Sequence, residues 1–381
     1  MKRNLSLLSL SGVFVLSLIA CSKGVTPPEH FDYVSVGSDN YLLHTDLQEG
    51  YANSDTPASY ISTHDICFES LSASRDVTIS WTIDTDKKPS KYIFELAESA
   101  SLDKELQTFT TKKQEISFSN LKVNTDYYYR VTSYYDNDHQ YPSDVQTFSA
   151  GSKIRNINAE GVENIRDIGG YNTENGKKIK QGLIYRSAQL NYDKKDEDAV
   201  KSAPTTKGKN TLVKELKIKT EVDLREKNNS KGKDETIGIT KSPLGSSVTY
   251  LNLPMRYGGS PIITNELNKE SLVSFFDLLT DESNYPIVFH CIQGKDRTGA
   301  LAYVIGTLCG ASYEDMLKDY LFSNFANIGS KTSSSGINAY ENGIRDSEGE
   351  TISEKTKNYL MNALDIEENT LNKIIEILVE D

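Results

Sequence analysis

The stretch from Tyr285 to Leu308 constrains the fold of this chain more than any other. An apolar run that contains the β-branched pair Ile287 and Val288 predicts a buried strand. The run stops at Cys291, and from Thr298 onward apolar residues recur at helical spacing. The sequence therefore predicts a strand, a tight loop and a helix N-terminus in direct succession.

A loop that lies over a helix N-terminus is suited to binding phosphate. Unpaired N–H groups and the positive end of the helix dipole attract anions, and the same field stabilises a thiolate. Cys291 begins the loop and is expected to be ionised at neutral pH, and Arg297 ends it with a planar fork for two phosphoryl oxygens. The alternative is a buried core cysteine with an arginine nearby by accident. Gly294, Thr298 and Gly299 complete the pattern, and together they favour the phosphate-binding interpretation.

Histidines are too few to supply a distant base. The chain has five, and His290 is the only one after residue 139. A cysteine–histidine dyad is therefore excluded within the C-terminal half, and the loop itself must activate Cys291.

The segment His290–Gly299 resembles the signature loop of the cysteine-based protein-tyrosine phosphatase superfamily. Its ending, Gly-Lys-Asp-Arg-Thr-Gly, is similar to that of atypical bacterial tyrosine phosphatases, some of which also act on phosphoserine or phosphoinositides. The resemblance implies a Cys291 nucleophile, a cysteinyl-phosphate intermediate, and no metal or cofactor. It also implies a phosphate-binding loop made of Ile292, Gln293, Gly294, Lys295, Arg297 and Thr298.

Each part of this loop has an expected role. Arg297 and the N–H groups from Ile292 to Arg297 are expected to hold the phosphoryl oxygens. Thr298 is expected to donate to the sulfur, and His290 to fix the shape of the loop through hydrogen bonds.

Two aspartates are candidates for the general acid. Better-known tyrosine phosphatases carry this aspartate on a Trp-Pro-Asp loop, but the only tryptophan here is Trp81, far from Cys291 in the sequence. In the atypical bacterial relatives an aspartate inside the signature loop takes the role, and Asp296 matches it. The alternative is that Asp296 only braces its charged neighbours, and Asp223 is the reserve candidate.

Residues 151–381 are predicted to form an α/β domain with a central, mostly parallel sheet, because strand and helix patterns alternate along them. Arg166 and Asp167 precede a Gly-Gly turn, and Asp223 and Arg225 end a predicted strand. Both pairs resemble motifs of the same bacterial family and are expected to support the site. For Arg166 and Asp167, holding the turn is favoured over a place near the active site.

Residues 58–150 are predicted to form a β-sandwich, because apolar and polar residues alternate in several short runs separated by turns. The run from Leu121 to Val131 resembles a fibronectin type III module. This resemblance implies that Tyr127 occupies the tyrosine-corner position and that Trp81 anchors the core. The fold class is therefore multi-domain, with an all-β sandwich followed by an α/β phosphatase domain.

Residues 1–20 are predicted to be a signal peptide, with a basic start and an apolar stretch too short for a membrane span. The ending Leu-Ile-Ala-Cys resembles the lipobox of bacterial lipoproteins, which implies cleavage before Cys21 and its lipidation. The alternative is an ordinary secretory signal or a short anchor. Residues 21–57 are polar and are interpreted as a tether or a small N-terminal segment. The expected location is the outer membrane or the periplasmic face of a bacterial membrane, through a lipid anchor.

Composition excludes other classes of function. The 381 residues suffice for two or three domains, and a net charge of −12 argues against nucleic-acid partners. The four cysteines show no paired spacing, so neither a zinc site nor a disulfide framework is predicted.

Three hypotheses of function follow. The first is hydrolysis of phosphotyrosine, and of phosphoserine, in a phosphorylated protein. The second is an inositol phosphate or phosphoinositide phosphatase on the same loop, which the charge of Lys295 favours because it could hold a second phosphate. The third is a non-catalytic surface-binding lipoprotein.

Overall fold

The computed structural model describes residues 33–36, 39–66, 72–83, 87–135, 139–258 and 261–380. The predicted signal peptide, residues 1–20, and the predicted lipidation site, Cys21, lie outside these ranges. None of the helices within these ranges has both the length and the apolar character needed to span a lipid bilayer.

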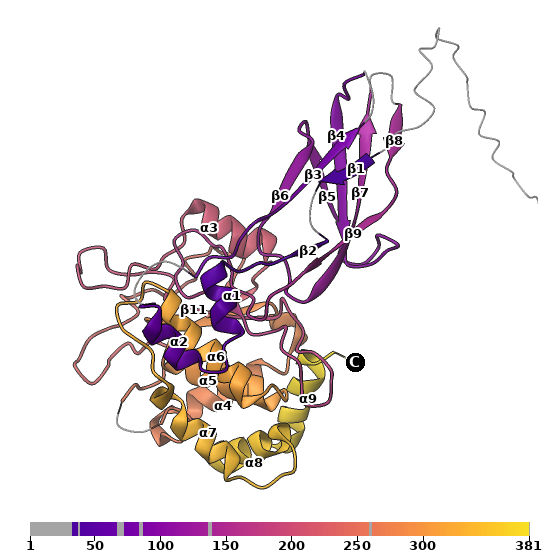
Figure 1. Cartoon of the computed structure of the whole chain (residues 1–381). Coiled ribbons are helices and arrows are strands. Elements are labelled where there is room, and N and C mark those ends of the chain that lie inside the picture. Colours follow the sequence, from indigo (N-terminus) through magenta and orange to yellow (C-terminus); the bar gives the residue numbers. More distant parts are fainter. Residues whose placement is uncertain are drawn as a thin grey trace, which may run out of the picture.

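Two β-sheets form the N-terminal module (Figure 1). The three-stranded sheet has the order β1 (Tyr33–Val36), β3 (Val77–Ile83), β6 (Glu115–Phe118). The second sheet has the order β2 (Asn40–Tyr41), β9 (Gln146–Ala150), β7 (Thr125–Tyr134), β4 (Lys91–Ala97), β5 (Gln107–Thr111), and β8 (Gln140–Pro142) pairs with β7. Alternating apolar side chains of both sheets share one core, in which Trp81 contacts Phe94. The two sheets therefore form a sandwich, as the period of two predicts.

Tyr127 and Trp81 are both buried in this core. The hydroxyl of Tyr127 accepts the backbone N–H of Lys122, five residues upstream, at 2.8 Å. This bond has the geometry of a tyrosine corner. The assignment of the sandwich to the fibronectin type III class stays a prediction.

Two short helices, α1 (Asp46–Ala52) and α2 (Pro57–Thr63), lie between β2 and β3 in the sequence. Thr45 and Gln48 form a capping box at the start of α1. Tyr51 and Ile61 belong to the core of the C-terminal domain, and the Tyr51 hydroxyl donates to the carbonyl of Lys318 at 2.7 Å. The part of residues 21–57 that the structure describes is thus folded, and α2 packs on the C-terminal domain although it falls within the range predicted as sandwich.

A five-stranded mixed sheet forms the centre of the C-terminal domain. Its order is β10 (Arg166–Asp167), β11 (Ile184–Ser187), β14 (Ile287–His290), β12 (Thr220–Asp223), β13 (Thr249–Asn252). All neighbouring strands are parallel except β10, which is antiparallel to β11. The central strand β14 is buried along its whole length, so the sheet is the mostly parallel one that the sequence predicts.

Two cores cover the two faces of this sheet. Ile287 and Phe289 of β14 belong to the larger core, and Val288 between them belongs to the smaller one. Figure 1 shows one group of helices on the larger-core side, namely α4 (Lys269–Leu278), α5 (Arg297–Leu308), α6 (Tyr313–Leu321), α7 (Asn338–Arg345), α8 (Ile352–Leu364) and α9 (Glu368–Leu378). On the other side lies α3 (Thr206–Asn210). Leu212 of the π-helical turn η1 (Thr211–Glu215) belongs to the smaller core. Short 3-10 turns connect these elements, namely η2 (Glu266–Asn268), η3 (Glu282–Asn284), η4 (Phe322–Phe325) and η5 (Ser334–Gly336).

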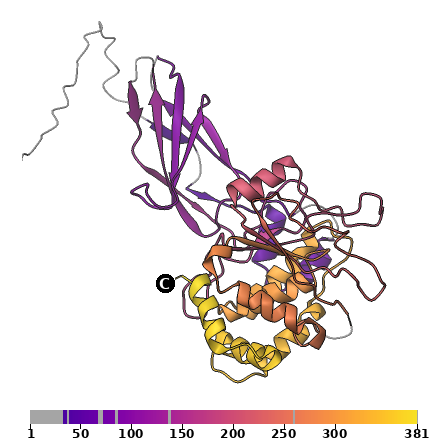
Figure 2. The same cartoon turned by 180° about the vertical axis from the view of Figure 1, so that it is seen from behind.

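The sandwich is joined to the C-terminal domain by buried polar contacts, and both Figure 1 and Figure 2 show it extending from one end of that domain. Arg155 pairs with Asp167 at 2.7 Å and donates to the carbonyls of Asn120 at 2.8 Å and Leu121 at 3.3 Å. Gln181 bonds both backbone groups of Val123, at 2.9 and 2.8 Å. These bonds fix the orientation of the two domains, because breaking them would leave buried polar groups unpaired.

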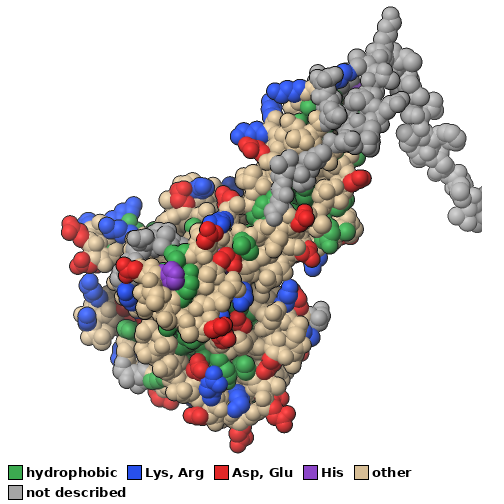
Figure 3. All heavy atoms as spheres, in the orientation of Figure 1, with side chains coloured by type: hydrophobic (Ala, Val, Ile, Leu, Met, Phe, Trp, Pro, Cys, Tyr) green, Lys and Arg blue, Asp and Glu red, His purple; other side chains and the backbone are tan. Residues whose placement is uncertain are grey.

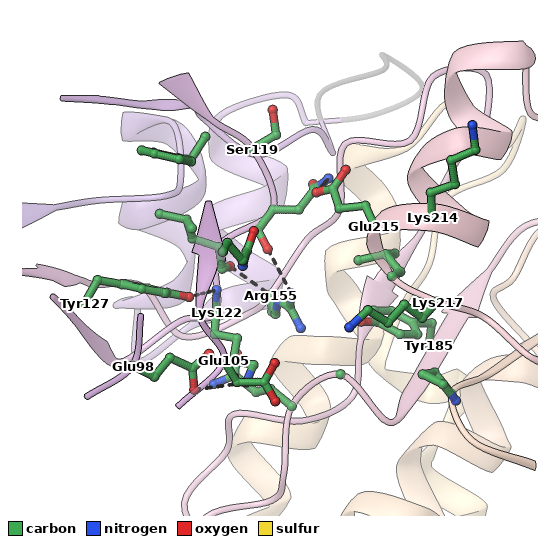
Figure 4. A pocket seen from close by; sticks show the side chains of 18 of the residues that line it. Glu98, Glu105, Ser119, Lys122, Tyr127, Arg155, Tyr185, Lys214, Glu215 and Lys217 are labelled. Carbon is green, nitrogen blue, oxygen red and sulfur yellow. Dashed lines mark hydrogen bonds and ion pairs between the residues drawn. The ribbon is translucent and has the colours of Figure 1, made fainter. Parts of the chain in front are cut away.

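A cavity of about 730 Å³ lies beside this junction (Figure 4). It is lined by the sandwich and by residues near the starts of β11, β12 and β14, such as Lys217 and Pro286. Some of the charged side chains that line it are paired within the protein, since Lys122 pairs with Glu98 at 2.8 Å and Arg155 with Asp167.

Charged side chains of both signs are interspersed on the face seen in Figure 3. The described part of this face therefore presents no single-signed surface that would steer a charged partner.

Candidate active site

The loop of residues 291–296 follows the central strand of the sheet. Because β11, β12 and β14 are parallel, their ends meet at one edge, where His290 lies opposite Ser187 and Asp223. The chain then turns through the loop into α5, which begins at Arg297 and is buried throughout. The predicted succession of strand, loop and helix N-terminus is confirmed.

Gly294 is required by the shape of the loop. Its φ is +66°, a conformation that side chains disfavour. A Cβ atom at this position would also lie 2.3 Å from the carbonyl oxygen of Ser187 on β11. The loop therefore packs against the neighbouring strand so closely that only glycine fits.

The carbonyl groups of the loop point toward the protein. The carbonyl of Ile292 accepts the N–H of Gln189 at 3.1 Å, that of Gln293 accepts Asn164 Nδ2 at 2.9 Å, and that of Gly294 accepts Arg186 Nη2 at 2.7 Å. By contrast, no acceptor among the described residues binds the N–H groups from Ile292 to Arg297. Six unpaired donors over a helix N-terminus form a cradle for a phosphoryl group.

A buried cluster of two arginines and one aspartate holds this loop. Asp319 of α6 pairs with Arg166 at 2.7 Å and with Arg186 at 2.5 Å. Burial raises the pKa of the Asp319 carboxyl, but the two guanidinium groups outweigh this effect and hold that pKa below its usual value. Arg186 donates to the loop directly, and Arg166 donates to Asn164 Oδ1 at 2.6 Å, which orients the amide that binds Gln293.

Arg166 and Asp167 are neighbours in the sequence, but their side chains lie at two different places in the domain. Arg166 lies beneath the loop, close to the active site, which is the alternative that the sequence disfavoured. Asp167 accepts the N–H of Gly169 at 2.8 Å and pairs with Arg155 at the domain junction, so it holds the Gly-Gly turn as predicted.

His290 lies beneath the start of the loop and is fully buried. One ring nitrogen is 3.0 Å from Glu221 Oε1, and the other is 3.2 Å from the carbonyl of Cys291. Ser242 donates to the other oxygen of Glu221. His290 thus contacts the backbone of Cys291, in keeping with the expected role in loop shape.

Arg297 is fixed by one of its terminal nitrogens. Nη1 donates to Glu235 Oε2 at 2.7 Å and to the carbonyls of Leu224 and Met255, each at 3.2 Å. Burial raises the pKa of Glu235, but Arg297 outweighs this effect and leaves it below its usual value. No acceptor among the described residues binds Nε or Nη2 of Arg297. These two donors share one edge of the guanidinium and can hold a phosphoryl group through two bonds.

Asp296 is the N-cap residue of α5, but its side chain does not cap the helix. Its carboxylate is 3.8 Å from Lys295 Nζ and is about a quarter exposed. Burial raises the pKa of Asp296 above its usual value, against the opposing charges of Lys295 and Arg297. A carboxyl that keeps its proton to higher pH and remains accessible is suited to general acid catalysis.

Asp223 is unsuited to that role. It is fully buried, and Arg225 donates to both of its oxygens, at 2.9 and 2.7 Å. Burial raises the pKa of Asp223, but His290 and Arg225 outweigh it and bring that pKa below its usual value. This closed pair supports the end of β12, and it leaves Asp296 as the better proton donor of the two candidates.

Lys295 and Gln293 contact the segment that follows η4. Lys295 Nζ donates to Ser330 Oγ at 2.9 Å and to the carbonyl of Lys331 at 3.3 Å. Gln293 donates to the carbonyl of Ile328 at 2.6 Å and accepts from Ser330 at 3.0 Å. The two side chains thus brace the loop from outside, and Lys295 is already engaged by protein oxygens.

The two described cysteines differ in chemistry. Cys309 lies at the far end of α5, and burial raises the pKa of its thiol to about 12. Cys291 lies beside the unpaired donors, and Thr298 Oγ1 is buried without a hydrogen-bond partner. The bond from Thr298 to the sulfur is thus not formed here, although its hydroxyl is free to make it. In the ranges that the structure describes, no cluster of His, Cys, Asp or Glu side chains could hold a metal ion.

Five supporting residues were not predicted from the sequence, namely Asn164, Arg186, Glu221, Glu235 and Asp319. Asp319 pairs with arginines 153 and 133 positions away, and Glu235 comes from a polar segment without a motif. Local signals existed for three of the five. Asn164 begins the Asn-x-Arg-Asp-x-Gly-Gly run and Arg186 lies in a Tyr-Arg-Ser run, both similar to motifs of the bacterial family, and Glu221 begins the predicted strand that ends at Asp223 and Arg225.

Comparisons with known proteins agree with this geometry. A family model described as the tyrosine phosphatase family matches residues 157–380. A Cupriavidus necator protein named as a candidate tyrosine-protein phosphatase is 25% identical over 183 residues, which cover 44% of this chain and 62% of that protein. The chain thus spans less than two thirds of the length of that relative.

Two solved structures are also similar. The core catalytic domain of the PP-IP phosphatase Siw14 from S. cerevisiae, in complex with citrate, has 20% identity and a TM-score of 0.27, over 44% of this chain and 84% of that one. The tyrosine phosphatase OH1 of the Orf virus, described as having triple substrate specificity, has 14% identity and a TM-score of 0.19, over 52% and 84%. At these TM-scores, neither structure carries a conclusion about this chain.

Proposed function

Because the chain belongs to the tyrosine phosphatase family, we propose that it hydrolyses phosphate monoesters through a cysteinyl-phosphate on Cys291. Phosphotyrosine in a protein is the proposed main substrate, and phosphoserine a further one. The observation that carries the proposal is the loop itself, where six unpaired N–H groups directly follow Cys291 and Arg297 keeps one edge of its guanidinium free of protein acceptors.

In the first step the thiolate of Cys291 attacks phosphorus in line with the leaving oxygen. An S–P bond forms, the P–O bond to the leaving group breaks, and Asp296 gives its proton to the departing oxygen. The loop N–H groups and the Nε and Nη2 donors of Arg297 stabilise the charge on the three equatorial oxygens.

In the second step water attacks the cysteinyl-phosphate. Asp296, now ionised, accepts a proton from that water, an O–P bond forms, and the S–P bond breaks. Thr298 can donate to the departing sulfur, because its hydroxyl has no other partner. Inorganic phosphate leaves, and both Cys291 and Asp296 return to their starting states.

The sequence also supports proposals about location. A lipid anchor at Cys21 would place the enzyme at the outer membrane or on the periplasmic face of a bacterial membrane. The sandwich, proposed to be of the fibronectin type III class, would then separate the catalytic domain from the anchored end. Globomycin treatment of expressing cells tests the anchor, because this inhibitor of lipoprotein signal peptidase makes an unprocessed precursor that retains residues 1–20 accumulate only if Cys21 follows a lipobox.

The test of the enzymatic proposal is hydrolysis of a small aryl phosphate by the full chain in the presence of a chelator. We expect turnover in the wild type, the same turnover in Cys309→Ser, and none in Cys291→Ser. Turnover that persists in Cys291→Ser, or its absence in the wild type, would contradict the proposal and favour the non-catalytic hypothesis.

A further inference from the structure

The large apolar side chains that are exposed on this molecule fall into two groups. Within the described residues, six large apolar side chains are exposed, namely Leu42, Leu106, Val145, Ile237, Tyr257 and Leu267. The first three belong to the sandwich and its flank, and the last three come from segments fastened around Arg297. We call Ile237, Tyr257 and Leu267 the apolar rim.

Ile237 lies two residues after Glu235, which pairs with Arg297. It is 45% exposed and has a φ of +53°. Asp234 holds this turn by accepting the N–H groups of Thr236 at 2.8 Å and Gly238 at 3.0 Å. A left-handed conformation is strained for a β-branched residue, and such strain is found mostly where function requires it. The chain thus holds an exposed isoleucine in a strained conformation two residues from the carboxylate that pairs with Arg297.

Tyr257 lies two residues after Met255, whose carbonyl accepts from Arg297. Its side chain is 58% exposed. The Asp296 carboxylate raises the pKa of Tyr257, with burial second, and Cys291 also acts on it. The phenol ring is therefore within electrostatic reach of both the proposed acid and the nucleophile.

Leu267 is 68% exposed, in the turn η2. The next residue, Asn268, fastens this turn to the segment that carries Tyr257. Its side chain accepts the N–H of Arg256 at 2.6 Å and donates to the carbonyl of Arg256 at 3.2 Å. Leu267 and Tyr257 thus project from segments that are bonded to each other.

We propose that the apolar rim is a docking surface for an extended phosphopeptide with apolar side chains flanking the phosphorylated residue. This inference rests on the proposed function and narrows its substrate class. Single exposed apolar residues need no explanation, but here three of them project from segments whose neighbouring residues are bonded to Arg297 or to one another, and exposed apolar groups near a site mark an interaction surface. A peptide can cover such a rim with apolar side chains while its phosphate enters the loop.

A free inositol phosphate fits this rim poorly. Its ring carries charged or hydroxyl groups on every carbon, and contact with Ile237 or Leu267 would remove water from them without replacing a hydrogen bond. The lysine that could have favoured a second phosphate, Lys295, already donates to Ser330 and Lys331. Both observations favour a substrate with apolar flanks.

The test uses two phosphotyrosine peptides of equal length and charge, one with leucine and valine flanking the phosphorylated residue and one with serine. For the wild type, full-length chain we expect kcat/KM to be roughly tenfold higher for the apolar peptide. In Ile237→Asn combined with Leu267→Ser, the ratio should fall to about one. Asparagine is chosen because it tolerates the left-handed conformation of this turn. The matched control is Leu106→Ser on the sandwich, which removes an apolar side chain of similar exposure and should keep the wild-type ratio.

Equal kcat/KM values for the two peptides in the wild type, or a preference that survives the double substitution, would overturn the inference. Binding of wild type to phosphatidylserine vesicles that the double substitution abolishes, together with equal peptide rates, would assign the rim to a membrane and overturn it as well. Failure of the proposed function is seen separately, as absent turnover of the small aryl phosphate. In that case the affinity of Cys291→Ser for the two peptides, measured by fluorescence anisotropy, still decides whether the rim distinguishes them.

Discussion

Two buried clusters of arginine and aspartate lie at two places in the C-terminal domain. Under the catalytic loop, Asp319 joins Arg166 and Arg186, and at the domain junction Asp167 pairs with Arg155. In both, guanidinium groups also donate to backbone carbonyls. The carbonyls differ, since Arg186 binds Gly294 of the loop, whereas Arg155 binds the sandwich.

The two clusters thus use the same kind of hydrogen bond, from a guanidinium group to a backbone carbonyl, for two different purposes. Where the acceptors are loop carbonyls, drawing them inward leaves the N–H groups facing outward, and the cluster shapes a phosphate cradle. Where the acceptor carbonyls belong to the sandwich, the cluster only joins the sandwich to the C-terminal domain. Catalytic activity should therefore depend on the first cluster and not on the second.

The largest expected effect is that of breaking each cluster at its carboxylate. Asp319→Asn and Asp167→Asn should each lower the free energy of unfolding by about 3–5 kcal/mol, because the first leaves the buried guanidinium groups of Arg166 and Arg186 without their carboxylate and the second leaves that of Arg155. Chemical denaturation measures this loss. Activity per folded molecule separates the two, since it should fall sharply in Asp319→Asn and stay near wild type in Asp167→Asn. Equal activity losses would remove the distinction between the clusters.

The Asp319 cluster also predicts a pH dependence. The folded pKa of Asp319 is lower than its unfolded value, so its contribution to stability is present above the unfolded value of about 3.9 and is lost as pH falls through the folded one. Asp319→Asn should lack this part of the acid destabilisation.

The next largest effect concerns the free edge of Arg297. Arg297→Lys keeps a charge that can pair with Glu235 but loses the two parallel donors, and kcat/KM for an aryl phosphate should fall by roughly 10²–10³-fold. A fall of less than tenfold would mean that the unpaired edge does not hold the phosphoryl group.

A smaller effect is expected for the general acid. Asp296→Asn should lower kcat by roughly 10²-fold for a peptide substrate. Because the acid acts in its protonated form, kcat of the wild type should fall as pH rises through the pKa of Asp296, which burial raises above its usual value. This alkaline fall should be absent in Asp296→Asn. If Asp223→Asn abolished it instead, the assignment of the acid would be wrong.

The smallest effect lies at the junction. Gln181→Ala removes two bonds to the backbone of Val123 and should lower the free energy of unfolding by about 1–2 kcal/mol. Activity of the folded enzyme should not change, which thermal denaturation and an aryl phosphate assay check together. A change in kcat would show that the junction influences the loop.

The strand, loop and helix around Cys291 could be predicted because their determinants are local. One short stretch of sequence contains the strand, Cys291, Gly294 and Arg297. Within it the spacing of the apolar residues changes from that of a strand to that of a helix. The sandwich was predicted for the same reason, since strands that alternate apolar and polar residues can be recognised from short segments of the sequence.

What holds the loop could not be predicted, because it depends on contacts between distant positions. Asp319 looks like any polar residue of an amphipathic helix until α6 is packed beside Arg166 and Arg186. Glu235 belongs to a polar segment whose one contact with Arg297 leaves no periodic signal. The docking of α1 and α2 was missed since each helix has only seven residues, too few to show a clear apolar face.

The central claim is that phosphate is transferred to Cys291. It can be tested by rapid denaturation at alkaline pH, where an S–P bond is stable, during turnover of an aryl phosphate, followed by mass spectrometry of the peptide that contains Cys291. Asp296→Asn is the variant to use, because an aryl leaving group needs little help from the acid while the second step is slowed. We expect a fraction of Cys291 to carry the mass of one phosphoryl group, and none in Cys291→Ser. Steady turnover without any phosphorylated Cys291, or turnover in Cys291→Ser, would contradict the account.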